Sequence, residues 1–418
     1  MLACSCGRSY PSRLALPITC VCGELAGIKT PDVDVRSIRR PICDGCQHRK
    51  PRDRCGLLPE GRNYIEGAKG LPNPNAYCPD HEWAGPFVRG RVGFLSECYM
   101  PVGGTEVWHQ TLLPRLRDVV GFVSFNGAMT RGDLAKLPCT TGIGLEAARQ
   151  LAWCVDVLVV WGLGSQLSEI LTRATPKVVV VNHFDDRADW NNRLLQEAEP
   201  HADRFVHLCK SGRNVCGTDA CYIPNAPAPE RIQADQPRHL IRQELGVLPE
   251  QRMLVSISRL APEKRLDVLI RAANQLPANY RFVLAGTGND SAYEGYLRGL
   301  AGNRVQFVGS VEHPGRLLRA ADSFVSASAC EGYGLSAAEA MLAGVPVVST
   351  PVGLLEDSPE LARLVPINGT ATDWVTAIHT DFANPQAQRR RANIAQRKID
   401  RVQAFAESWQ HLIDEVAR

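Results

Sequence analysis

Two basic and two acidic residues within positions 253–353 have types and spacings suited to a ligand that carries both phosphates and hydroxyls. Arg259 and Lys264 bracket a turn between a short β-branched run and a stretch whose apolar residues recur at helical spacing. At such a turn the backbone N–H groups and the helix dipole favour anions, so two cations suit a diphosphate. The alternative interpretation is a pair of solvated loop charges.

The two acidic residues, Glu331 and Glu339, lie eight positions apart. The first falls on a turn loosened by Gly332 and Gly334, and the second falls just over one turn into a predicted helix. Carboxylates are acceptors suited to vicinal hydroxyls, so one can hold a ribose and the other a transferred sugar. For Glu339 the alternative is a first-turn glutamate that complements the helix dipole.

The elements that must position these groups alternate between strands and helices, which predicts parallel sheets. Buried strands are predicted at 91–96, 119–125, 155–162, 177–184, 204–209, 221–225, 253–259 and 323–328. Helices are predicted from the loop at 101–106 to about Arg117, from 265 to 276 and from 337 to 343. His183 comes at the carboxyl end of a strand, where the alternative to a functional role is a satisfied structural histidine.

Several motifs resemble, in order, the carboxyl-terminal domain of family 4 glycosyltransferases (glycosyl transferases group 1). They are SRLAPEK at 258–264, AGTG at 285–288, VQFVG at 305–309 and EGYGLSAAEAM at 331–341, followed by GVPVV at 344–348. This family has the GT-B fold, an α/β architecture of two facing Rossmann-like domains with the substrate cleft between them. The residues at 103–106 resemble the Gly-Gly-x-Glu loop of the family.

The resemblance implies a retaining transferase that uses a UDP-, GDP- or ADP-linked sugar and no catalytic metal. It implies that Arg259 and Lys264 bind the donor diphosphate, that Glu339 binds the ribose and that Glu331 binds the sugar. It places His183 near the sugar, and the catalytic set that it implies is Arg259, Lys264, Glu331 and His183. The implied donor-binding residues are Gly103, Gly104, Arg259, Lys264, Gly286, Glu331, Gly332, Tyr333, Gly334, Leu335 and Glu339.

One departure from the family concerns the donor pocket. After Gly353 the family usually has a second glycine, but this chain has Leu354, and the later glycine-rich turn is missing from 356–368. The identity of the donor nucleotide therefore stays open.

The composition and the motifs together suggest four parts. They are a Cys-rich module at 1–89, an acceptor domain at 90–228, a donor domain at 229–400 and a terminal helix at 401–418 that packs back on the domains. The net charge of +3 on 418 residues singles out no class of partner. No apolar run approaches a membrane span, and Arg8 and Arg13 interrupt any secretory pattern, so we expect a cytoplasmic protein.

Eight of the fifteen cysteines fall within the first 78 residues, and we expect them to bind metal rather than form disulfides in a reducing compartment. We predict two structural zinc sites of four thiolates each, with His81 as a substitute ligand in the second site and an iron–sulfur cluster as the alternative. The ligands are Cys4, Cys6, Cys20 and Cys22 for the first site, and Cys43, Cys46, Cys55 and Cys78 for the second.

The sequence leaves the acceptor unknown, and it permits three functions besides that of an ordinary transferase. The basic residues in 36–54, set within a zinc module, suggest an enzyme that glycosylates a hydroxymethylated base in DNA. The module can equally stabilise the fold or hold two domains together. A catalytically idle GT-B binding protein and a nucleotide-sugar epimerase are the second and third of these functions.

Overall fold

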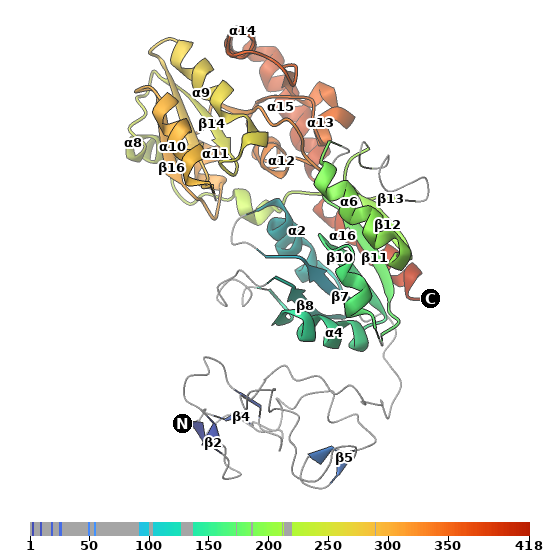
Figure 1. Cartoon of the computed structure of the whole chain (residues 1–418). Coiled ribbons are helices and arrows are strands. Elements are labelled where there is room, and N and C mark those ends of the chain that lie inside the picture. The colour runs from blue at the N-terminus through green and yellow to red at the C-terminus, as the bar shows by residue number, and fades with distance from the viewer. Residues whose placement is uncertain are drawn as a thin grey trace.

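The computed structural model describes residues 92–99, 103–126, 137–172, 174–184, 187–210, 212, 220–288 and 290–418, together with six two-residue strands between residues 2 and 55. From residue 92 on, the chain forms two α/β lobes, one above the other in Figure 1. Each lobe is built around one parallel sheet.

The sheet of the first lobe has seven parallel strands in the order β13-β12-β11-β10-β7-β8-β9. Its central strands are fully buried runs rich in valine, as expected for a sheet covered on both faces. The strands are β7 (Val92–Ser96), β8 (Val119–Ser124), β9 (Thr140–Ile143), β10 (Val157–Trp161), β11 (Lys177–Asn182), β12 (Arg204–His207) and β13 (Cys221–Tyr222).

The described helices of the first lobe connect these strands. They are α2 (Gly104–Leu112), continued by the 3-10 turn η2 (Leu113–Arg115), α4 (Leu145–Cys154), α5 (Gln166–Ile170) and α6 (Asp189–Ala198), continued by η3 (Glu199–His201). The helix predicted to reach Arg117 ends earlier, because Pro114 has no N–H for the next α-helical bond and the chain tightens into η2.

The sheet of the second lobe has six parallel strands in the order β16-β15-β14-β17-β18-β19. Its strands are β14 (Arg252–Ile257), β15 (Tyr280–Ala285), β16 (Val305–Gly309), β17 (Ser323–Ser326), β18 (Val347–Ser349) and β19 (Arg363–Leu364). Counted within the lobe, this is the order 3-2-1-4-5-6 of a Rossmann sheet. The expectation of an α/β fold with two parallel, Rossmann-like sheets is confirmed.

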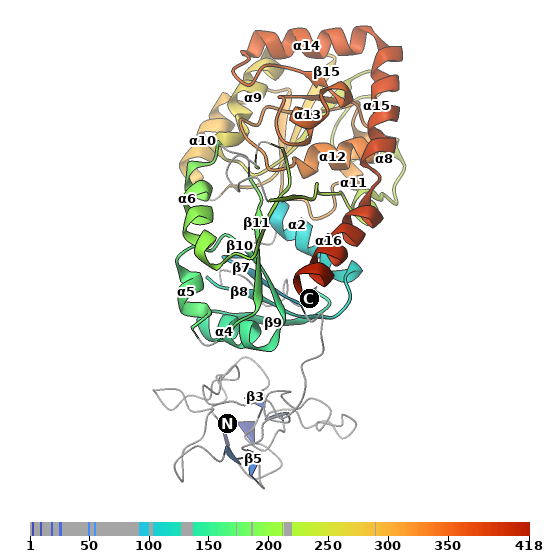
Figure 2. The same ribbon diagram turned by 90° about the vertical axis from the view of Figure 1, so that its right-hand side faces the viewer.

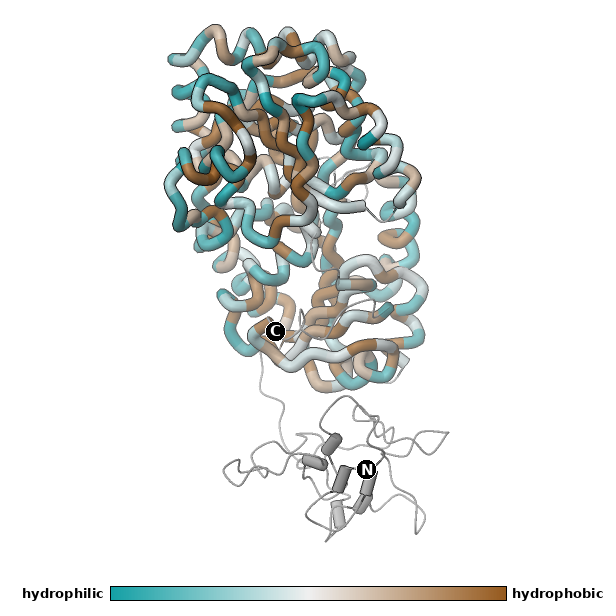
Figure 3. Tube along the Cα trace, turned by 90° about the vertical axis from the view of Figure 1, so that its left-hand side faces the viewer, coloured by the Kyte–Doolittle hydropathy of each residue, from teal (hydrophilic) through white to brown (hydrophobic). Residues whose placement is uncertain are grey.

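The helices of the second lobe cover both faces of its sheet, and hydrophobic residues gather in the central strands of each lobe (Figure 3). The helices are α8 (Arg238–Glu244), α9 (Leu266–Gln275), α10 (Ser291–Leu300), α11 (Gly315–Ala320), α12 (Leu335–Leu342), α13 (Leu354–Asp357), α14 (Ala371–Ala383) and α15 (Pro385–Ile399). Three 3-10 turns accompany them: η4 (Pro229–Ile232), η5 (Pro262–Lys264) and η6 (Pro359–Leu361).

Both sheets have a switch point, where the chain reverses the direction in which it adds strands. It lies between β7 and β10 in the first lobe and between β14 and β17 in the second. Loops at the carboxyl ends of the two strands diverge there, which is where open α/β sheets bind ligands.

The last helix, α16 (Val402–Val416), leaves the second lobe after α15 and lies against the first lobe (Figure 2). Its Trp409 is fully buried, with its ring centroid 5.2 Å from that of Trp108 in α2. Arg117 Nη2 lies 3.1 Å from Asp414 Oδ2, at the end of the same helix. Two basic residues of α15 form ion pairs within the second lobe: Arg391 binds Asp381, and Lys398 binds Glu360.

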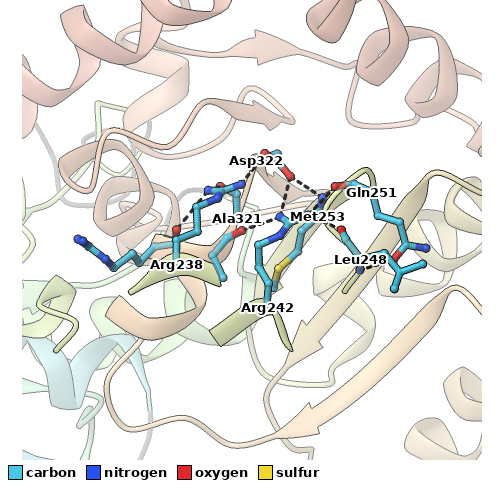
Figure 4. Close-up of polar contacts among 9 residues, drawn as sticks. Arg238, Arg242, Leu248, Gln251, Met253, Ala321 and Asp322 are labelled. Carbon is cyan, nitrogen blue, oxygen red and sulfur yellow. Dashed lines mark hydrogen bonds and ion pairs between the residues drawn. The ribbon is translucent and has the colours of Figure 1, made fainter. Parts of the chain in front are cut away.

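A polar cluster at the amino edge of the second sheet fastens α8 to it (Figure 4). The buried Arg242 donates to Asp322 Oδ2 at 3.0 Å and to the carbonyls of Ala320, Leu248 and Gln251. Asp322 Oδ2 also accepts from the backbone N–H of Met253 at 2.7 Å. This cluster lies at the opposite end of the strands from the switch point, so its role is structural.

The two-residue strands near the amino terminus form antiparallel pairs. They are β1 (Leu2–Ala3) with β2 (Ser9–Tyr10), β3 (Ile18–Thr19) with β4 (Leu25–Ala26), and β5 (Arg49–Lys50) with β6 (Arg54–Cys55).

Candidate functional site

The two loops at the switch point of the second sheet meet through charged side chains. Lys264, at the end of η5 after β14, donates to Glu331 Oε1 at 2.7 Å, and Ser328 Oγ donates to the same oxygen at 2.7 Å. The backbone N–H of Ala329 donates to the carbonyl of Glu263, which joins the two loops. Residues 67 positions apart are therefore brought together, where the Rossmann arrangement places a ligand.

Arg259 lies on the first of these loops and is the most exposed of the predicted groups. Its guanidinium donates to Glu263 Oε1 at 2.9 Å, and about half of its side chain is open to solvent. An exposed ion pair of this kind is weak, so the guanidinium can turn to an anionic ligand at little cost.

The turn before α12 needs its glycines for space and for backbone conformation. Gly334 is the N-cap of α12 with a left-handed φ of 86°, which a side chain would strain. A Cβ at Gly332 would lie 1.7 Å from the carbonyl oxygen of His183 in the first lobe. The Glu331–Gly334 turn therefore contacts the other lobe directly, and the two lobes meet at the switch point of the second sheet.

Glu339 projects from α12 into a buried position and forms an ion pair with the connection between the lobes. Its Oε1 lies 2.6 Å from Nε of Arg231 in η4, and both side chains are largely buried. Burial raises the pKa of Glu339, while the Arg231 guanidinium lowers it and opposes that effect. This partner was not foreseen, because Arg231 stands in a Pro- and Ala-rich linker 108 positions away.

The amino terminus of α2 faces the amino terminus of α12. A Cβ at Gly104 would lie 4.0 Å from the Leu335 side chain of the second lobe. A Cβ at Gly103 would lie 2.2 Å from the carboxylate of Glu106, so the close approach of that carboxylate requires glycine there. Neither N-cap residue makes a side-chain cap hydrogen bond. The convergence of two such helix N-termini between the lobes favours an anion.

His183 follows β11 and is buried at the same junction. Its ring contacts Trp108 and Trp161 edge to face, at centroid distances of 4.9 and 5.5 Å. Burial and the neighbouring His109 lower the pKa of His183 well below its usual range. Its Nε2 is buried and has no hydrogen-bond partner among the described residues, which is unusual for a buried polar atom.

Two further predicted residues shape the backbone around the site. Gly286 has φ of 138°, and a Cβ there would lie 1.8 Å from the carbonyl oxygen of Ser258, next to Arg259. The buried Tyr333 accepts a hydrogen bond at its carbonyl from the N–H of Leu354, at 2.9 Å. The second glycine of the family is thus replaced by the first residue of α13, whose amino terminus is fixed to the Glu331–Gly334 turn.

The short helix α13 also adds contacts between the lobes that the sequence did not indicate. Glu356 Oε1 lies 3.3 Å from Arg187 Nη2, and Tyr222 donates to Asp357 Oδ2 at 2.8 Å. Lys210 lies 3.9 Å from the same aspartate. Each partner belongs to the first lobe, and no local pattern in the sequence marks residues that pair over 135 positions or more.

The predicted metal ligands fall where the structure describes no side chains. Of the eight cysteines only Cys55 lies in a described element, as the end of β6, and the other seven cysteines and His81 lie outside the described residues. Among the residues from 92 on that the structure describes, no group of three or more His, Cys, Asp or Glu is arranged to hold a metal. No helix in the described part of the chain is long and apolar enough to cross a membrane.

Two parallel Rossmann-like sheets with ligand-binding edges at their junction define the GT-B class of folds. Comparison with known proteins agrees. Residues 251–383 match the family model described as Glycosyl transferases group 1. That segment contains β14 to β19 and the Lys264–Glu331 and Glu339 positions.

Curated relatives resemble part of the chain. A D-inositol 3-phosphate glycosyltransferase from Mycolicibacterium gilvum (strain PYR-GCK) is 33% identical over 239 residues, which cover 54% of this chain and 51% of the relative. One from Rhodococcus opacus (strain B4) is 32% identical over 242 residues, covering 54% and 52%. The chain therefore spans about half the length of these relatives.

Solved structures share the fold at low sequence identity. The Anabaena protein Alr3699/HepE, solved in complex with UDP and glucose, has a TM-score of 0.68 and 20% identity, covering 77% of this chain and 99% of that chain. A glycosyltransferase from Rickettsia africae ESF-5 has a TM-score of 0.66 and 13% identity, covering 78% and 99%. The fold of residues from 92 on is thus the GT-B fold of these glycosyltransferases.

Proposed function

We propose that the protein is a retaining glycosyltransferase that moves a sugar from a nucleotide-sugar donor to an acceptor hydroxyl. The observation that carries the proposal is the meeting of Lys264 with Glu331 at the switch point of the second sheet, opposite the amino terminus of α2. That place combines cations and helix N-termini, which bind a diphosphate, with carboxylates, which accept from hydroxyls.

Each group has a role in this proposal. Lys264 and Arg259 bind the donor diphosphate and stabilise the charge that builds on it as the bond to the sugar breaks. Glu331 accepts hydrogen bonds from the sugar hydroxyls, and Glu339 accepts them from the ribose. The remaining donor contacts come from the backbone at Gly103, Gly104, Gly286, Gly332, Tyr333, Gly334 and Leu335.

The reaction breaks the bond between the anomeric carbon and the diphosphate oxygen and forms one between that carbon and the acceptor oxygen. The acceptor proton passes to the leaving phosphate, and the acceptor attacks from the face that the diphosphate leaves. Because two protein cations neutralise the diphosphate, this proposal uses no catalytic metal. A neutral His183 offers its ring nitrogen to the sugar.

Among the donors, UDP-sugars are tested first, because Alr3699/HepE was solved with UDP and with UDP-glucose. The experiment measures nucleotide release by the purified protein from UDP-, GDP- and ADP-sugars. Acceptors to be added include D-inositol 3-phosphate, after the names of the relatives, and hydroxymethylated DNA. Release that depends on one donor and one acceptor is expected, and NMR of the product should show the anomeric configuration of the donor.

The same experiment separates the competing functions. Stimulation by hydroxymethylated DNA would favour the DNA-modifying enzyme. Binding of a nucleotide sugar with no turnover would favour an idle binding protein. Nucleotide release with every acceptor left out would favour an epimerase. No binding of any nucleotide or nucleotide sugar would contradict the proposal.

We also propose that the Cys-rich segment holds structural zinc. In support, the paired strands β1 and β2 stand on either side of Cys4 and Cys6 in the sequence, and the paired strands β3 and β4 stand on either side of Cys20 and Cys22. Elemental analysis of the purified protein should find zinc at about two ions per chain. Cys4→Ser should remove about one, whereas Cys154→Ser on α4 should remove none. Protein purified without zinc, or with iron and sulfide, would contradict this assignment.

A further inference from the structure

Arg231 occupies a position that joins three parts of the molecule. It lies in η4, which connects the two lobes and packs on α11 and α12 of the second. A Cβ at Gly315 in α11 would lie 2.1 Å from the carbonyl oxygen of Gln233, so the chain after η4 lies directly on that helix. The connection is therefore fixed to the second lobe at the level of the backbone.

The two neighbours Glu230 and Arg231 bind opposite lobes. Glu230 accepts from Arg115 Nη2 of η2 at 2.9 and 3.1 Å, and η2 continues directly from α2 in the first lobe. Arg231 donates to Glu339 Oε1 of α12 at 2.6 Å. One dipeptide thus links the helix that begins at Gly104 to the helix that begins at Leu335, the two whose N-termini converge at the site.

The pair with Glu339 is the more buried of these two contacts. The exposed fractions of the side chains are 15% for Arg231 and 5% for Glu339, against 24% for Arg115 and 54% for Glu230. The guanidinium occupies Oε1, and no described residue hydrogen-bonds Oε2 of Glu339. A carboxylate held in this way presents one oxygen to a ligand in a fixed direction.

We propose that Arg231 is a positioning residue for the donor: it holds Glu339 with Oε2 turned to the ribose and, through the adjacent Glu230–Arg115 contact, ties that carboxylate to the placement of the first lobe. This inference rests on the proposed function, because it assumes that Glu339 binds the ribose. Donor binding and the closure of the two lobes are then coupled through one guanidinium.

The charge state of Glu339 makes the role of Arg231 depend on pH, which a role in packing alone would not do. The helix α12 packs against η4, α15, β17 and β18. Among the described residues, Arg231 is the charged group that shifts the pKa of Glu339. From α15, the neutral Gln396 donates to the Leu342 carbonyl. Without Arg231, burial alone governs the carboxyl and raises its pKa. Glu339 is then protonated at low pH and accepts weakly, and it ionises as the pH rises.

The experiment compares nucleotide affinity of the full-length protein by calorimetry at pH 6.0 and pH 8.5, using UDP, or GDP or ADP if the wild type binds that instead. Arg231→Met is expected to weaken binding at least tenfold at pH 6.0 relative to wild type, with the loss shrinking to about threefold or less at pH 8.5. The affinity of each variant is divided by that of the wild type at the same pH, because protonation of the nucleotide affects both proteins equally. Glu339→Gln is expected to lose affinity by the same factor at both pH values.

One further variant tests the coupling of donor binding to lobe closure, and another is a control for the loss of a surface ion pair. Arg115→Met should leave nucleotide affinity within about twofold of wild type but reduce the contraction that X-ray scattering detects when the donor is added. Arg316→Met removes an exposed ion pair with Glu244 and should change neither.

The outcomes separate this inference from the function on which it rests. A wild type that binds no nucleotide would contradict the proposed function itself. A wild type that binds, with Arg231→Met equal to it at both pH values, would overturn only the role of Arg231. If Arg231→Met does not fold, Arg231→Lys decides: it keeps the charge that holds Glu339 ionised but not the directional Nε contact. It should bind at least threefold more weakly at both pH values, and wild-type affinity at both would overturn the inference.

Discussion

Lys264 is the residue whose loss should most directly test the site. Its ammonium group is largely buried against Glu331, in a place where the donor diphosphate is proposed to bind. A charge-assisted contact contributes about 1.5–3 kcal/mol, so Lys264→Ala should lower the rate of nucleotide release about 10- to 100-fold. Arg298→Ala, which removes an exposed pair with Glu294 on α10, is the matched control and should keep the wild-type rate. Normal turnover by Lys264→Ala would exclude this lysine from the site.

The buried histidines should make the stability of the protein depend on pH. Burial lowers the pKa of His109 to about 3 and that of His183 well below its usual range. Because the unfolded chain binds these protons below its own pKa of about 6.5 and the folded chain does not, stability is complete above that pH and falls as the pH drops.

The measurement is urea unfolding of wild type and His109→Gln at pH 7.5, 5.5 and 4.5. The variant loses packing at pH 7.5, but below about pH 6.5 its disadvantage should shrink by about 1.4 kcal/mol per pH unit, since it has lost one group that resists protonation. His313→Gln on an exposed turn is the surface control. A difference between variant and wild type that does not change with pH would contradict the prediction.

At the scale of elements, the cluster under α8 should be important for stability but not for chemistry. Arg242→Met removes the donor to Asp322 and to three carbonyls, and leaves these acceptors short of partners in a largely buried setting. We expect the free energy of unfolding to fall by about 2–4 kcal/mol. Arg316→Met on the surface of α11 should cost under about 1 kcal/mol.

Denaturant unfolding followed by circular dichroism measures both variants of this cluster. Because the cluster lies at the amino ends of the strands, the folded fraction of Arg242→Met should keep wild-type nucleotide affinity. Equal stability of the two variants, or a loss of affinity in folded Arg242→Met, would show that the cluster does something other than fasten α8.

The sequence predicted eight of the strands of the two lobes, among them the most valine-rich runs. Strands such as β10 and β11 are runs of valine, and His183 directly follows β11, at the carboxyl end of a strand as predicted. Five strands were not predicted: β9, β15, β16, β18 and β19. The edge strand β9 carries no apolar pattern, because its residues Thr-Thr-Gly-Ile are half-exposed. Pairings such as Arg231 with Glu339 depend on how two elements dock. Local periodicity in the sequence does not predict such docking.

At the scale of the whole molecule, α16 joins the last part of the chain to the first lobe. Trp409 fills the space between α16 and Trp108, whose ring in turn contacts His183 at 4.9 Å. Ion pairs of Arg117 with Asp414 and of Arg204 with Glu415 flank this contact. The pairs are exposed and contribute little, so the buried ring should supply most of the free energy that holds α16 in place.

Trp409→Ala should therefore lower the free energy of unfolding by about 3–5 kcal/mol, the usual cost of deleting a buried aromatic ring. Because the same helix continues from α15 of the second lobe, its loosening should also separate the unfolding of the two lobes. We expect one cooperative urea transition in wild type and two in the variant, the first lobe melting earlier. Limited proteolysis at intermediate urea should then cut the variant within 92–222 and leave a fragment that contains 251–383.

The control for that variant is Ser408→Ala, on the exposed side of the same helix, which should unfold as the wild type does. If Trp409→Ala unfolds in a single transition at unchanged urea concentration, α16 merely lies on the first lobe and the interface between the lobes must be stable without it. The contacts of α13 with Arg187, Lys210 and Tyr222 would then be links between the lobes outside the donor site, together with the Arg115–Glu230 pair. If instead the transition splits, the terminal helix is what makes two Rossmann-like lobes fold as one unit around the site between them.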